Sequence, residues 1–337
     1  MSLSNEQRER IRLYLLEKID QKQPAVIQKT ADAFAVTPAT VYKYLDALIA
    51  EEWVRKQKRG AYEMVSKTKT VRLSRAAGEI ASEQTIYDRY IRPELNDLPA
   101  NVVGIWDYLC SEMLNNVIDH SGAETLTIEV SRDALNTRIR LSDNGVGVFE
   151  KIRAFLGLSS VQEAAGELLK GKLTTDAKRH SGEGIFFSSR LADVFVIFSS
   201  GQVFSYHRFE EAASCVPETE AKGTTVFMQL SNRSKKQAKD VFDRYAEVDG
   251  DFTRTHIPLR NYFESAPVSR SQAKRLCAGL ERFSEVELDF EGLDWMGQGF
   301  AHQLFVVFAA EHPQVRLIPV NMVPDVAGMH RHVTAAR

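Results

Sequence analysis

The side chains best suited to chemistry lie in residues 111–121, SEMLNNVIDHS, where acids, amides and a histidine are spaced through an otherwise apolar segment. When this segment is projected on a helix at about 100° per residue, Glu112, Asn116 and Asp119 share one side and His120 lies at its edge. Apolar side chains cover the opposite side. Such a stripe is more often a solvated helix face than a site. The motifs downstream are therefore needed to distinguish the two.

Two glycine motifs follow this helix. The strand predicted at residues 137–142 runs into DNGVG, which begins at Asp143 and places an anchored carboxylate beside backbone that can approach a flat ring closely. Further along, Gly182, Glu183 and Gly184 form a turn that enters a predicted helix. The exposed amides of such a turn form a cradle for phosphate. The two motifs therefore predict places for a flat ring and for phosphate.

The elements that must position these motifs are predicted from periodicity. Alternating apolar residues predict strands at residues 125–130 and 137–142, in an antiparallel sheet with one buried face. Thr224 lies at the start of a further strand, GTTVFMQLS. Between the two glycine motifs, residues 159–171, SSVQEAAGELLKG, are predicted to form a short helix. Each motif thus lies where a strand or a helix begins or ends.

Glu-x-x-x-Asn on a helix, then DxGxG, then GxG before a helix, then GT at a strand start resemble the GHKL (Bergerat-type) ATP-binding fold. DNA gyrase, MutL-type repair proteins, histidine kinases and anti-sigma serine kinases share that fold. The resemblance covers residues 99–232 and implies an α/β sandwich that binds ATP and Mg²⁺. It also implies a lid, including residues 159–171, that folds over ATP and reopens after hydrolysis. A sensor histidine kinase is not expected, because no pair of long helices carrying a histidine precedes this unit.

The resemblance implies a role for each matching residue. Glu112 matches the catalytic residue that polarises the attacking water or hydroxyl, and Asn116 matches the Mg²⁺ ligand. Asp143 matches the acid that accepts the adenine amino group, which selects adenine over guanine. The remaining matching residues would let the backbone pass close to the base and ribose, contact phosphate, or complete the adenine site: Gly145, Gly147, Gly182, Glu183, Gly184 and Thr224.

Two further groups near the motifs have more than one interpretation. Asp119 and His120 would either support metal or phosphate contact or belong to a helix cap. The cations Lys172, Lys178 and Arg179 lie in the predicted lid, where they would contact the γ-phosphate or stay solvated.

The N-terminal segment predicts three helices and a hairpin. Apolar spacing predicts a helix over residues 5–20, Pro24 is expected to open a second helix through Phe34, and Thr37 is expected to cap a third. The basic stretch WVRKQKRGAYEMV then predicts a hairpin. This order resembles a winged helix-turn-helix DNA-binding domain at residues 1–66.

The winged-helix resemblance implies that the third helix enters the major groove of double-stranded DNA while the hairpin meets phosphate or the minor groove. Residues 1–75 carry fifteen Lys and Arg against nine Asp and Glu, a charge of +6; the whole chain carries −2, so the remainder carries −8. Only the first segment therefore suits a polyanion. The alternative is a winged helix used for protein contacts. The expected DNA contacts are Thr37, Thr40, Tyr42, Lys43, Tyr44, Arg55, Lys56, Lys58 and Arg59.

The C-terminal segment alternates helices and strands in the order αβαβ, which predicts a small α/β domain over residues 251–337. Residues 285–305, EVELDFEGLDWMGQGFAHQLF, resemble the STAS-like fold of anti-sigma factor antagonists. In those antagonists a phosphorylatable serine precedes the glycine at the turn into the helix. Here Gln298 precedes Gly299, and Gly297 also lacks a hydroxyl. We therefore expect a module that docks a protein partner, self-associates as in a homodimer, or covers the ATPase lid.

Composition agrees with a soluble multidomain protein: 44% of the 337 residues are hydrophobic and 26% are charged. No apolar run reaches the roughly 18 residues of a membrane span, and the N-terminus is too polar for a signal peptide. We expect a cytoplasmic location and no membrane partner. Cys110, Cys215 and Cys277 lack metal-ligand spacing and are expected to be buried apolar residues.

The sequence thus predicts a multidomain α+β protein. The function expected is that of an ATP-binding, ATP-hydrolysing, DNA-binding regulator whose nucleotide state controls DNA or partner binding. The alternatives are a serine/threonine protein kinase of the anti-sigma type and a DNA-stimulated ATPase of a defence or mobile-element system. The expected parts are a winged helix (1–66), a connecting segment (67–98), a GHKL ATP-binding domain (99–232), a helical linker (233–250) and a STAS-like domain (251–337).

Overall fold

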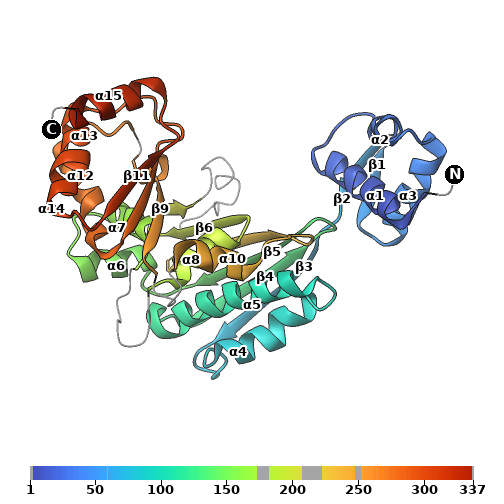
Figure 1. The fold of residues 1–337 in the computed structure, drawn as a ribbon. Coiled ribbons are helices and arrows are strands. Elements are labelled where there is room, and N and C mark those ends of the chain that lie inside the picture. Colours follow the sequence, from blue (N-terminus) through green and yellow to red (C-terminus); the bar gives the residue numbers. More distant parts are fainter. Residues whose placement is uncertain are drawn as a thin grey trace.

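The chain folds into three units that follow one another in sequence (Figure 1). The computed structural model describes residues 3–58, 60–172, 182–206, 222–246, 252–263 and 265–335. The N-terminal unit stands apart beyond one end of a central sheet, and the C-terminal unit lies against the other end of the central unit (Figure 1). Every helix in these ranges falls short of the length or the apolar character that a membrane crossing requires.

The N-terminal unit contains three helices and a two-stranded antiparallel hairpin. Ser4 and Gln7 form a capping box at the start of the first helix, and Thr37 caps the third, as predicted. The prediction that Pro24 opens the second helix is wrong: the helix begins at Val26, after Ala25 in a left-handed conformation. The elements are α1 (Asn5–Asp20), α2 (Val26–Phe34), α3 (Pro38–Ala50), β1 (Val54–Lys58) and β2 (Ala61–Met64).

The central unit is built on a six-stranded antiparallel sheet in the order β3-β4-β5-β8-β6-β7. The two predicted strands pair with each other, and Leu126, Ile128, Ile139 and Leu141 point into a buried core with Trp106. The strands are β3 (Lys67–Ser74), β4 (Thr125–Arg132), β5 (Asn136–Asp143), β6 (Val194–Ser199), β7 (Gln202–Ser205) and β8 (Thr224–Ser231).

Helices cover this sheet, with α5, α8 and α10 along one face (Figure 1). The helix predicted between the glycine motifs is α7, capped by Ser160. The helical elements are α4 (Glu83–Ile86), η1 (Tyr87–Ile91), η2 (Arg92–Glu94), α5 (Ala100–Asn115), η3 (Asn116–Ser121), α6 (Val148–Leu156), α7 (Val161–Lys170), α8 (Gly184–Leu191) and α10 (Ala238–Tyr245).

Residues 67–98, which the sequence suggests are a connecting segment, belong to the central unit. Strand β3 pairs with β4 along its whole length, and Ile86, Tyr87, Ile91 and Leu95 are buried in the same core as the sheet. The strand is hard to predict because it lies at the sheet edge and its first four residues are exposed. Its apolar alternation is therefore missing.

The C-terminal unit has a three-stranded parallel sheet in the order β11-β10-β9. The expected αβαβ order is incomplete, because β9 precedes the first long helix and α15 follows the last strand. The sequence of β9, RTHIP, is short and polar, so it gives little periodicity. The elements are β9 (Arg254–Pro258), α11 (Leu259–Tyr262), α12 (Arg270–Cys277), η4 (Leu280–Arg282), β10 (Glu285–Asp289), α13 (Gln298–His302), η5 (Gln303–Phe308), α14 (Ala309–Glu311), β11 (Arg316–Val320) and α15 (Pro324–Thr334).

The central and C-terminal units share a buried interface. Phe186 of α8 lies in the same apolar cluster as the C-terminal core, with its ring centroid 4.4 Å from that of Phe252. The guanidinium of Arg190, on the same helix, is buried and donates to the carbonyl of His256 at 2.9 Å. The two units therefore pack as neighbours through side chains and not only through the linker.

The cysteines agree with the sequence analysis where the structure describes them. Cys110 and Cys277 are buried and form no disulfide. Cys215 lies outside the described residues.

Candidate functional site

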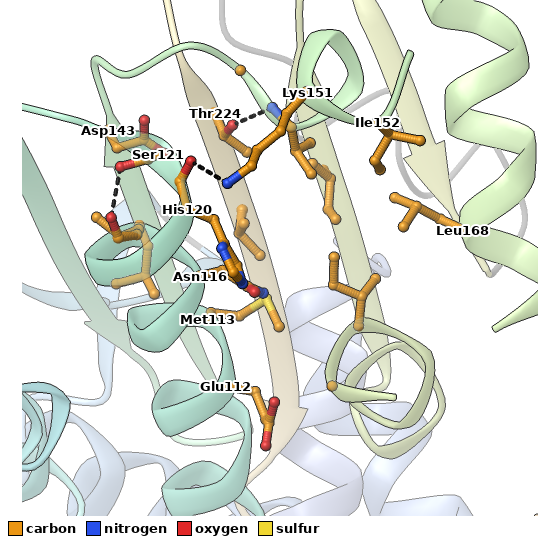
Figure 2. Close-up of a pocket in the computed structure, with 18 of the residues that line it drawn as sticks. Glu112, Met113, Asn116, His120, Ser121, Asp143, Lys151, Ile152, Leu168 and Thr224 are labelled. Carbon is orange, nitrogen blue, oxygen red and sulfur yellow. Dashed lines mark hydrogen bonds between the residues drawn. The ribbon is translucent and has the colours of Figure 1, made fainter. Parts of the chain in front are cut away.

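One cavity of about 270 Å³ brings together most of the residues that the motifs single out (Figure 2). Its walls come from α5, η3, the ends of β5 and β8, and the helices α6, α7 and α8. Of the predicted cofactor residues, Asp119, Gly145 and Glu183 do not line it. The predicted catalytic residue Glu112 lines the cavity, together with the predicted cofactor residues Asn116, His120, Asp143, Gly147, Gly182, Gly184 and Thr224.

The helix that carries the polar stripe changes its geometry at Asn116. The α-helical part ends at Asn115, and the chain continues as the π-helical turn η3, so the uniform projection at about 100° per residue is wrong here. A π turn holds more residues than an α turn. As a result His120, and not Asp119, follows Glu112 and Asn116 along the cavity wall, while Asp119 is exposed. Figure 2 shows Glu112, Asn116 and His120 along this wall.

Glu112 lies directly against the glycine turn that begins α8. A Cβ added to Gly184 would lie 2.1 Å from Glu112 Oε2, so a larger residue here would displace this carboxylate from its present position. Burial raises the pKa of the Tyr108 hydroxyl, and the nearby carboxylates of Glu112 and Glu183 raise it further. Glu183 is thus close to Glu112 although it does not line the cavity.

Asp143 is the buried carboxylate of the cavity, with 7% of its surface exposed. Its Oδ1 accepts a hydrogen bond of 2.7 Å from the Gly145 amide. Burial raises its pKa, and backbone hydrogen bonds from Gly145 and Thr224 act in the opposite direction. A Cβ on Gly223 would lie 2.1 Å from the Asp143 carbonyl oxygen. This glycine therefore permits the close approach of β8 to the end of β5.

Thr224 links the start of β8 to the start of α6. Its hydroxyl oxygen accepts a hydrogen bond of 3.0 Å from the Val148 amide (Figure 2). Gly147, which precedes Val148, has a φ of 94° that other residues rarely adopt. Gly145 supports the same turn from behind, because a Cβ there would lie 2.2 Å from the Ser121 carbonyl oxygen.

The predicted lid cations do not gather at the cavity where the structure describes them. The ammonium of Lys172 donates to the carbonyl of Arg282, in the C-terminal unit, at 3.2 Å. Lys178 and Arg179 lie outside the described residues. Within the described ranges, no group of three or more His, Cys, Asp or Glu side chains is arranged to hold a metal ion.

The expected DNA-contacting residues occupy two places in the N-terminal unit. On α3, Tyr42 and Lys43 are exposed and Tyr44 is partly buried. On β1, Arg55 and Lys56 are exposed. Arg55 forms an ion pair with Glu63, and Lys58 is placed only as the last residue of β1. Arg59 lies outside the described residues.

The two threonines at the start of α3 have a structural task. The Thr37 hydroxyl accepts from the Thr40 amide at 3.3 Å, and the two hydroxyl oxygens lie 3.0 Å apart. Thr37 is exposed and Thr40 is partly buried. They therefore form the N-cap of α3, which fixes where this helix begins.

Comparison with protein-family models matches residues 272–327 to the STAS-like domain of unknown function DUF4325. The match runs from α12 into α15, so the C-terminal unit contains the STAS-like domain that the sequence predicts. No curated protein matches the chain. Gly297 caps α13 and Gln298 is its first residue, so neither place that would correspond to an acceptor serine carries a hydroxyl.

Lys151 is a charged residue of the cavity that none of the sequence motifs singles out. It lies on α6, directly after the DNGVG motif, in the stretch VFEKIRAFL. Phe149 and Ile152 are buried at helical spacing, and this was the signal from which α6 and its cavity-facing side could have been predicted.

Proposed function

We propose that this chain is an ATP-binding, ATP-hydrolysing regulator with a central unit of the GHKL type and an N-terminal winged helix that binds double-stranded DNA. The observation that carries the proposal is the meeting of Glu112, Asn116, Asp143 and Thr224 in one cavity, although they come from three separate segments. The order of these motifs and the glycines that permit their close approach support the same conclusion.

In this proposal the adenine ring binds beside Asp143. The Gly145 amide fixes the carboxylate, which accepts a hydrogen bond from the adenine amino group. Guanine would present a carbonyl oxygen to the same carboxylate with no proton between them, so adenine is selected. The Thr224 oxygen already accepts from the Val148 amide, which leaves the hydroxyl proton to donate to the base, directly or through water.

Glu112 is placed to polarise the attacking water, since its carboxylate lies in the cavity at the start of α8. The N-terminal amides of that helix provide a place for phosphate. Asn116, one helical turn after Glu112, would hold Mg²⁺, which usually takes one or two side-chain ligands and completes its shell with phosphates and water. When bound, Mg²⁺ would neutralise charge on the phosphates.

The N-terminal unit supports the DNA-binding part of the proposal through its helix order, its basic hairpin and the charge of +6 over residues 1–75. In a homodimer, two such units would engage two half-sites and raise the affinity steeply without new base contacts. The STAS-like domain would then provide the surface for self-association or for a protein partner.

The test is ATP turnover by the purified chain with Mg²⁺, with and without duplex DNA. We expect Glu112→Gln to lower turnover by at least about 100-fold, because a general base contributes that much, while ATP still binds. The matched control is Glu150→Gln on α6, whose carboxylate pairs with Arg153 and does not line the cavity. Absence of ATP binding by the wild type would refute the proposal.

The same preparation separates the remaining functions. Labelled phosphate transferred to a protein, in place of free phosphate, would identify a protein kinase. Turnover that rises with DNA of any sequence would identify a DNA-stimulated ATPase. For the regulator, the anisotropy of a labelled duplex must report different DNA affinities with ATP, with ADP and without nucleotide; identical affinities would reject nucleotide control.

A further inference from the structure

Lys151 extends from α6 into the cavity that the proposed function assigns to ATP. Its ammonium donates a hydrogen bond of 3.0 Å to the carbonyl of His120, on the opposite wall (Figure 2). One turn earlier, the Val148 amide is tied to the Thr224 hydroxyl. The lysine therefore starts from a fixed helix end and reaches across the cavity close to Asn116 and His120.

The charges on the cavity wall give this lysine a particular importance. Among the described residues that line the cavity, the acids are Glu112 and Asp143, and Lys151 is the single Lys or Arg. Two carboxylates alone would oppose the entry of a polyanion, because like charges within a partly buried site interact strongly. A cation on the opposite wall offsets this repulsion.

The bond that Lys151 makes here is suited to exchange. A carbonyl oxygen is a neutral acceptor, whereas hydrogen bonds between an ammonium and a phosphate oxygen are charge-assisted and stronger. The ammonium carries three donors, so it can keep the His120 carbonyl and still bind phosphate. Its flexible four-carbon stem allows the small movement that this needs.

We propose that Lys151 binds the phosphate chain of the nucleotide, opposite the glycine turn at Gly182 and Gly184, and so makes the cavity selective for phosphorylated adenosine over adenosine. This inference rests on the proposed ATP-binding function and adds a ligand-contacting residue to it. Lys151 is then a specificity-determining residue that acts in binding, whereas Glu112 acts on the attacking water.

The test is calorimetric titration of the full-length protein with adenosine, AMP, ADP and ATP in the presence of Mg²⁺. For Lys151→Met we expect the ATP affinity to fall roughly 10- to 100-fold, the effect of losing a charged hydrogen bond, with adenosine affinity changed less than about 2-fold. Lys151→Arg keeps the charge and should retain most of the ATP affinity. The control is Lys236→Met, whose ammonium also donates to backbone carbonyls, those of Leu191 and Ala192, but lies outside the cavity lining.

The ratio of ATP to adenosine affinity decides the result. If Lys151 only tied α6 to η3, its substitution would lower the affinity for all four ligands alike. An equal loss for all ligands, or an unchanged ratio, overturns the role of Lys151 and leaves the ATP site standing. If the wild type binds none of the four ligands, the proposed function and this inference fail together. Circular dichroism and melting curves of each variant establish that the proteins compared are folded.

Discussion

Lys170 is a buried residue whose removal should weaken the contact between the central unit and the STAS-like domain and so lower the stability of the protein. It ends α7, is 1% exposed, and burial lowers its pKa. Its ammonium donates to Glu167 Oε1 at 2.6 Å and to the carbonyls of Arg275 and Ala278 at 2.8 and 3.0 Å. Those carbonyls lie at the C-terminal end of α12. The buried Lys170 ammonium therefore caps a helix of the C-terminal unit and also pairs with Glu167 of the central unit.

The expected loss in free energy of unfolding follows from the polar groups that Lys170→Met would leave without this cation. The Glu167 side chain, only 15% exposed, would lose its cationic partner and keep only its hydrogen bond with Tyr262 among those described, and two carbonyls would lose the Lys170 donor. Breaking a buried ion pair on one side costs about 3–5 kcal/mol. Adding Glu167→Leu removes the unpaired carboxylate, so the double variant should recover part of the loss. It should not recover all of it, because the α12 carbonyls still lack a donor.

The assay is urea unfolding followed by circular dichroism, with the free energy of unfolding extrapolated to water. Lys239→Met is the control, since its side chain is 80% exposed and its ion pair with Asp243 is screened by solvent. A loss below about 1 kcal/mol for Lys170→Met would refute the reasoning. A double variant less stable than the single one would show that Glu167 stabilises the fold by another route.

Three further outcomes are expected. Gly184→Ala should lower ATP turnover with little loss of secondary structure, because its Cβ would lie 2.1 Å from Glu112 Oε2 and would displace this carboxylate; phosphate release and circular dichroism measure the two effects. Asp143→Asn should raise the melting temperature at neutral pH, because burial raises the pKa of this carboxyl and penalises its ionised form, and should weaken ATP binding. In the wild type, the raised pKa of Asp143 stabilises the folded state fully at pH values below the ordinary pKa of 3.8, where the carboxyl is protonated. This stabilisation is lost as the pH rises through the raised pKa, so the gain in melting temperature from Asp143→Asn should vanish in acid. Lys56→Ala should weaken binding to all DNA sequences alike and reduce the slope of log affinity against log salt by about one, measured by anisotropy; a change confined to one sequence would contradict a phosphate contact.

Local motifs were the predictable part of this protein. The N-cap at Thr37 and the alternation of β4 and β5 act within a few residues, so their effect can be read from sequence. The family match at residues 272–327 likewise agrees with a resemblance based on one continuous stretch.

The parts that sequence reasoning missed depend on neighbours distant in sequence. Strand β3 is held by pairing with β4 while its own residues stay largely exposed. The π turn at Asn116 depends on backbone hydrogen-bond register, which no residue type there dictates. Lys170 lies in the stretch that the sequence assigns to the lid, and its burial depends on the end of α12, more than 100 residues away in sequence. In each case tertiary contacts override the local preference.

The two outer units are held to the central unit by different kinds of contact, and this bears on how a nucleotide could control DNA binding. The C-terminal unit is packed through a buried aromatic cluster that includes Phe186, a residue of the cavity wall. The N-terminal unit meets the central unit through exposed ion pairs such as Lys67 with Glu52 and Arg233 with Glu9, and through Ala134 and Leu135 of the turn between β4 and β5, which are partly buried against its core. Exposed ion pairs contribute about 0–1 kcal/mol each.

A change at the cavity would therefore be transmitted to the STAS-like domain through rigid packing more readily than to the N-terminal unit. Control of DNA binding within one chain would have to pass through a weakly held junction. Control through self-association avoids that difficulty, because the STAS-like domain would alter the pairing of two chains and the paired N-terminal units would respond by bivalent binding. For the proposed regulator this favours a nucleotide-dependent dimer, and sedimentation velocity with ATP, with ADP and without nucleotide tests it. A chain that stays monomeric in all three states while its DNA affinity changes would require the intrachain route instead.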